Sequence, residues 1–138
     1  MINKRVIAAM LLAIGVQSAG STEIAAEWTF IGQITPSYNF RLDLQSTDVA
    51  GVFTLNGYSE LLLVTGAPRE AVVGSATFSP NEDIFAVSLF FNTSTGQNIT
   101  IGADLDPMTL SGDGEAIRVV SGGVDSSIAG TLAVVPIE

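Results

Sequence analysis

Apolar and polar residues alternate with a period of two over most of the chain beyond residue 20. The clearest stretch is 38–45, in which Tyr, Phe, Leu and Leu alternate with Asn, Arg, Asp and Gln. Residues 98–105 repeat the pattern. Such alternation is typical of a β-strand with one buried and one solvated face, whereas a helix would spread the same apolar residues around its axis. The pattern predicts an all-β protein.

The same period predicts about nine short strands, separated by residues that favour turns. The expected strands and their fragments are 27–34, 38–45, 49–56, 59–65, 71–79, 84–92, 98–105, 108–111, 116–121 and 127–135. In the segment 84–92, Phe85, Val87, Leu89 and Phe91 form one apolar face, and Ile84, Ala86 and Phe90 lie on the other. We therefore expect this strand to be central in its sheet.

Turn residues determine the expected connections between strands. Asn56-Gly57 is a strong hairpin signal, and Gly112-Asp113-Gly114 also predicts a turn. Short connections join antiparallel neighbours, because parallel strands need a long crossover. We expect an antiparallel β-sandwich in meander order, since several strands are apolar on both faces. The alternative is a flattened up-and-down β-barrel.

The first 20 residues have the pattern of a secretory signal peptide. Lys4 and Arg5 precede an apolar run over residues 6–16, and small residues follow it up to Gly20. The run is short for a membrane span, which takes about 20 residues. The sequence thus predicts a cleaved signal peptide over 1–20 and a single antiparallel β domain over 21–138, secreted or at the cell surface, with the periplasm as a further location.

Charge and residue usage exclude several classes of function. Without its leader the chain would carry three arginines against 14 acidic residues, a net charge of −11. Such a surface repels nucleic acid and anionic membranes, so we expect neither nucleic-acid binding nor membrane insertion of the mature chain. The sequence has no histidine and no cysteine. This excludes Ser-His and Cys-His catalysis, disulfides, and zinc sites built on these residues.

Acidic residues near the ends of strands suggest a calcium site. Calcium takes six to eight oxygen ligands, which carboxylates and carbonyls supply. Asp104 and Asp106 alternate around Leu105 and would point the same way if the strand continued that far, and Asp113 and Glu115 follow nearby. We predict these four residues as the candidate metal ligands. The alternative is that they cap turns and keep the surface soluble; no other cofactor is expected.

Carbohydrate binding and glycoside hydrolysis are the remaining alternatives. Tyr58, beside the Asn56-Gly57 turn, is the aromatic residue that we expect to be exposed and able to bind a ligand, whereas Trp28 and Tyr38 fall on apolar faces. A glycoside hydrolase needs a pair of carboxylates. The candidates are Glu27, Glu60, Glu70 and Glu82, all at expected strand edges or turns, where a solvated role is the simpler interpretation.

Three short stretches resemble exported bacterial proteins of the PEP-CTERM class. They are Glu27-Trp28-Thr29-Phe30-Ile31-Gly32, Val49-Ala50-Gly51-Val52-Phe53-Thr54-Leu55 and Gly130-Thr131-Leu132-Ala133-Val134-Val135-Pro136. The resemblance implies an exosortase-processed surface protein associated with exopolysaccharide or biofilm. After Pro136 the sequence reads Ile137-Glu138, without the proline-glutamate-proline motif, membrane helix and basic tail of that class.

These observations together predict a non-enzymatic structural or interaction protein of the cell exterior. Its expected partners are polysaccharide and, by strand pairing, a second copy or other surface proteins. The uncharged run 127–135 could provide such pairing if it lies at a sheet edge. We favour the other interpretation, in which this run is a well-buried last strand, because most terminal strands of compact domains are tied into the sheet.

Overall fold

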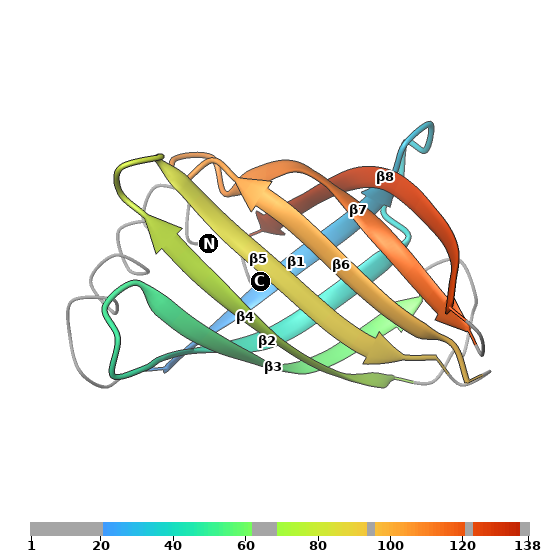
Figure 1. Cartoon of the computed structure of the whole chain (residues 1–138), viewed down its shortest axis with the longest axis horizontal. Helices are drawn as coiled ribbons and strands as arrows, with labels where there is room; N and C mark the ends of the chain where they lie inside the picture. Colours follow the sequence, from blue (N-terminus) through green and yellow to red (C-terminus); the bar gives the residue numbers. More distant parts are fainter. Residues whose placement is uncertain (1–20, 62–68, 94–95, 121–122, 136–138) are drawn as a thin grey trace.

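The computed structural model describes residues 21–61, 69–93, 96–120 and 123–135, and Figure 1 shows them as a single closed barrel. The expected leader, residues 1–20, lies outside the described residues. The eight strands are β1 (Ser21–Phe30), β2 (Tyr38–Ser46), β3 (Val52–Leu61), β4 (Glu70–Ser79), β5 (Ile84–Asn92), β6 (Asn98–Leu105), β7 (Ser111–Val120) and β8 (Gly123–Val135). No helix in these ranges is long and apolar enough to cross a membrane.

Each strand pairs with its neighbours in the sequence, and β1 also pairs with β8, which closes the barrel. The closing register runs from Ala25 opposite Val135 to Phe30 opposite Gly130, and every pairing is antiparallel. The predicted all-β class and meander order are confirmed. The predicted sandwich is not observed, and the barrel alternative matches the structure. β8 pairs with both β7 and β1, and its pairing with β1 covers residues 130–135, so most of the run 127–135 lies inside the closed sheet and not at an edge.

Two predicted turns were wrong. Asn56 and Gly57 lie inside β3, opposite Asp43 and Leu42 of β2. Gly112, Asp113 and Gly114 lie inside β7. The physical reason is steric: a Cβ atom on Gly57 would overlap the carbonyl oxygen of Arg41 on the neighbouring strand. A glycine in a strand interior permits this close approach of two backbones.

Side chains fill the interior of the barrel. Alternate residues of every strand face inward, and their apolar members form one core that includes Trp28, Phe40, Leu55, Leu89 and Ile101. The void that remains among the central side chains has a volume of about 10 Å³, which is roughly the room for one water molecule. The interior therefore offers no room for an organic ligand in the described structure.

Different side chains close the two ends. At one end Leu110 is fully buried; its backbone NH donates to the carbonyl of Asp106 at 2.7 Å, and its carbonyl accepts from the NH of Val134 at 2.8 Å. At the other end aromatic rings pack together, with ring centroids of Tyr38 and Phe91 5.3 Å apart and those of Trp28 and Phe30 5.8 Å apart. The filled interior and closed ends therefore leave the outer surface and the loops as the places where a ligand could bind.

Candidate functional site

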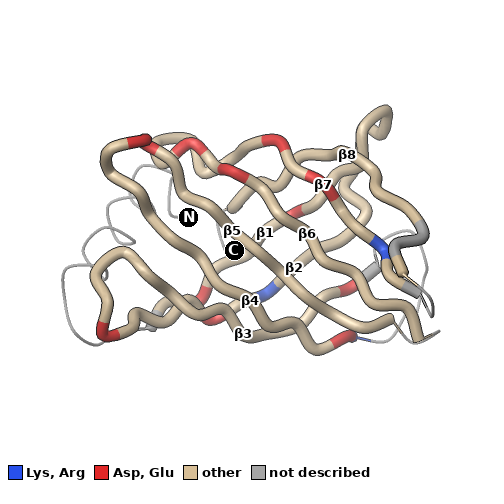
Figure 2. Tube along the Cα trace, in the orientation of Figure 1, with Lys and Arg blue, Asp and Glu red and all other residues tan. Residues whose placement is uncertain are grey.

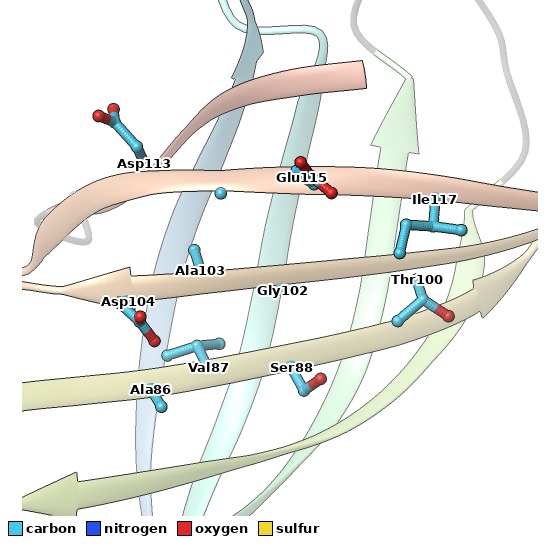
Figure 3. A pocket seen from close by; sticks show the side chains of 11 residues that line it. Ala86, Val87, Ser88, Thr100, Gly102, Ala103, Asp104, Asp113, Glu115 and Ile117 are labelled. Carbon is cyan, nitrogen blue, oxygen red and sulfur yellow. The ribbon is translucent and has the colours of Figure 1, made fainter. Parts of the chain in front are cut away.

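A surface hollow over β5, β6 and β7 is the candidate functional site. Its volume is about 570 Å³, far larger than the void inside the barrel. We call it the Gly102 hollow. It is lined by Ala86, Val87, Ser88, Thr100, Gly102, Ala103, Asp104, Asp113, Gly114, Glu115 and Ile117. The close-up in Figure 3 shows Gly102 between Glu115 of β7 and Ser88 of β5.

The register of the three strands explains why the surface is hollow at this point. Gly102 stands opposite Ser88 on one side and opposite Glu115 on the other. A Cβ atom added to Gly102 would meet nothing within 4 Å. The missing side chain therefore leaves an open floor of backbone, which longer side chains border.

Hydroxyl and carboxylate oxygens border this floor. Ser88 and Thr100 contribute hydroxyls, and Asp104, Asp113 and Glu115 contribute carboxylates. Figure 3 shows the carboxylates of Asp104 and Asp113 pointing away from one another. The hollow thus presents many hydrogen-bond acceptors and negative charge around a floor of backbone.

Three of the four predicted metal ligands lie at this hollow, and the fourth does not. Strand β6 ends at Leu105, so Asp106 begins a turn, where its Oδ1 accepts from the backbone NH of Met108 at 2.7 Å. Glu115 Oε2 accepts from the Ser127 hydroxyl at 3.1 Å, and Asp113 Oδ1 accepts from the Thr131 hydroxyl at 3.3 Å. Within the described residues no group of three or more acidic side chains could hold a metal ion.

Tyr58, the predicted ligand-binding residue, is partly covered. It lies on the outer side of β3, and the guanidinium carbon of Arg69 is 4.6 Å from its ring centroid. Arg69 Nε in turn donates to Glu60 Oε1 at 2.6 Å. The arginine therefore occupies a face of the ring on which a sugar would stack.

Sequence reasoning missed Phe90, an exposed aromatic residue on the outside of the barrel. Its exposed fraction is 44%, although its strand, which we expected to be central because both of its faces are apolar, is paired on both sides. It stands opposite Val73 of β4 and opposite Thr100 of β6. The sequence did contain a signal for this exposure. The odd-numbered residues of the strand form the core, so the even-numbered Phe90 must lie on the opposite, outer face.

The four candidate catalytic carboxylates are dispersed over the barrel. Glu60 is held by Arg69, and Glu82 lies in the exposed turn between β4 and β5. Glu70 lies at the barrel end near Tyr38; burial of the ring raises the pKa of that phenol, and the negative charge of Glu70 raises it further. Glu27 stands opposite Asn39 of β2, which separates it from Glu60 of β3.

Comparison of the chain with protein-family models, with curated proteins and with solved structures finds no match.

Proposed function

We propose that this protein is a non-enzymatic interaction protein of the cell exterior, and that it recognises its partner with the outer face of the barrel. The contrast between the two surfaces carries the proposal. The central void is about 10 Å³, while the Gly102 hollow on the outside is about 570 Å³. Ligand sites are normally concave surfaces that bury much of the ligand. The Gly102 hollow has the size of such a site, and the central void does not.

The sequence supports the extracellular assignment. Residues 1–20 have the three-part pattern of an export signal, and the chain lacks the cysteines that are common in small secreted eukaryotic domains. The strong acidic excess favours solubility in a saline exterior. A bacterial cell surface or exopolysaccharide matrix is the setting that we propose.

Carbohydrate binding is a second candidate, because one observation favours it. The exposed ring of Phe90 lies opposite Thr100, which also borders the Gly102 hollow. An apolar ring beside hydroxyl and carboxylate oxygens can contact both the C–H face and the hydroxyls of a sugar. Tyr58, which the sequence favoured for this role, is covered by Arg69.

The test of the proposed function asks whether the protein turns over any glycoside. The purified protein is incubated with a broad panel of glycosides over several pH values, and we expect no product above the buffer control. Glu27→Gln and Glu60→Gln variants provide the comparison, because their shapes are preserved while the carboxylate chemistry is removed. Turnover that either variant abolishes would contradict the proposal and establish a carboxylate hydrolase.

A further inference from the structure

Apolar side chains form a row across the outside of the barrel. The backbone register aligns Val73 of β4, Phe90 of β5, Thr100 of β6 and Ile117 of β7. Val73 is 52% exposed and Phe90 is 44% exposed. We call these four positions the outer row. Apolar residues gathered at one place on a surface commonly mark an interaction site, whereas single exposed ones need no explanation.

The outer row is continuous with the Gly102 hollow. Thr100 and Ile117 belong to both surfaces. Neighbouring strands are ~4.8 Å apart, so the row spans roughly 14 Å, about the length of four extended residues. Gly102 lies two residues along β6 from Thr100, which places the hollow roughly 7 Å from the row. Long, flexible side chains such as those of lysine and arginine suit a separation of this size.

The charge of this region is uniformly negative. Asp104, Asp113 and Glu115 border the hollow. Among the described residues, no lysine or arginine occupies an outer position of β4 to β7; Arg118 of β7 stands opposite the buried Ile99 and therefore faces inward. Figure 2 shows acidic positions along β6, β7 and their turns.

The negative charge of this region determines which class of partner can bind there. A nucleic acid or an anionic lipid surface would be repelled. A second copy of this chain, with its formal net charge of −9, would also be repelled. A cationic partner would be attracted to such a surface, because complementary electrostatic potentials speed the encounter of two molecules and disfavour partners of like charge.

We propose that the outer row and the Gly102 hollow dock a short, basic, amphipathic peptide segment of another protein. Its apolar side chains cover Val73, Phe90 and Ile117, and its lysine or arginine side chains lie over the floor at Gly102, beside Glu115. This inference rests on the proposed function, and it names the class of partner that the outer face takes.

The test uses the purified protein and a short fluorescein-labelled peptide in which leucine and arginine alternate. Two control peptides replace arginine by glutamate or leucine by serine. Binding is measured by fluorescence anisotropy at low and high ionic strength. We expect only the leucine–arginine peptide, and neither control peptide, to bind, and we expect its binding to weaken as salt screens the charges.

Matched variants locate the site. Phe90→Ser should weaken binding about fivefold or more, as removal of a central aromatic contact commonly does. The control is Ile34→Ser, because Ile34, in the segment between β1 and β2, is exposed but belongs neither to the outer row nor to the lining of the Gly102 hollow. Glu115→Gln should weaken binding and its salt dependence, whereas Asp43→Asn, at an exposed position on β2, should change neither. The thermal melts of all four variants should stay close to that of the parent.

Three results would overturn the inference: equal binding of the glutamate peptide, no difference between Phe90→Ser and Ile34→Ser, or no binding of the arginine peptide at low salt. If a neutral glycan bound in a Phe90-dependent manner and the arginine peptide did not, the peptide assignment would be wrong. The proposed function would stand in that case, because only turnover in the glycoside panel contradicts it.

Discussion

Tyr38 shows how one inward side chain can link stability to pH. Its ring packs against Phe40 at 6.1 Å and against Phe91 at 5.3 Å, at one end of the barrel. Burial raises the pKa of its phenol, and the nearby carboxylate of Glu70 raises it further. Both causes disfavour the phenolate in the folded state relative to the unfolded chain.

This shift predicts a loss of stability at alkaline pH. Above the ordinary tyrosine pKa of about 10, the unfolded chain releases the proton more readily than the folded protein, so the free energy of unfolding falls as pH rises. Urea denaturation between roughly pH 8 and pH 11 should show this fall. Tyr38→Phe should reduce it, and Glu70→Gln should reduce it less, because Glu70 is the smaller cause. If the free energy of unfolding of Tyr38→Phe fell with pH as steeply as that of the parent, Tyr38 would not be the cause of the fall.

Residue-scale roles were only partly predictable from the sequence. The burial of Trp28 and the inward position of Tyr38 followed from strand periodicity, and the structure confirms both. The exposure of Phe90 did not, because periodicity assigns residues to two faces without showing whether anything covers the second face. The contact between Arg69 and Tyr58 was not predictable either. The two residues lie on opposite sides of the segment between β3 and β4, and a local sequence pattern does not reveal a contact between them.

At the scale of elements, glycines within strands permit a close approach of neighbouring strands. Gly57 in β3 and Gly114 in β7 lie where a neighbouring strand approaches too closely for a side chain. The sequence places both next to Asn or Asp, so each pair also looks like a hairpin turn. The pattern therefore predicted strand content correctly and divided β3 and β7 wrongly.

Alanine substitutions of two strand glycines should have opposite outcomes. Gly57→Ala places a methyl group against the Arg41 carbonyl, and we expect destabilisation of at least about 3 kcal/mol, at the upper end for overpacking. Gly102→Ala is the matched control, because its methyl group meets nothing within 4 Å. That variant should be as stable as the parent or slightly more stable. Chemical denaturation measures both, and comparable losses in the two variants would refute the steric explanation.

At the scale of the molecule, closure of the sheet was the least predictable feature. We expected a sandwich because several strands are apolar on both faces. Each sheet of a sandwich also leaves one face outward, however, so this pattern does not distinguish a sandwich from a barrel. In this barrel the second face carries the outer row and stays uncovered within the described structure. Whether strands close into one barrel depends on pairing between β1 and β8, which are separated by nearly the whole chain.

The charge of the whole molecule predicts how it responds to salts. We expect calcium, magnesium and sodium chlorides to change the melting temperature equally at equal ionic strength, because the described carboxylates do not gather into a metal site. A calcium-specific rise would contradict this expectation. Specific binding would stabilise the fold by about 2.7 kcal/mol at a hundredfold excess over Kd. Asp104→Asn and Asp113→Asn would then show whether the predicted ligands are responsible.

The pairing of β1 with β8 has a consequence for the time course of folding. The barrel can seal only when Val135 reaches Ala25, so the last strand must be available before the first gains its second neighbour. Contacts so distant in sequence are slow to form, because the entropy of loop closure is lost before the contacts stabilise the chain. A nascent chain that has made only β1 to β7 holds a sheet with two open edges, and no lysine lies in the described strands to discourage pairing between molecules. The risk of aggregation is therefore concentrated in the interval before β8 arrives, and it ends when the sheet closes.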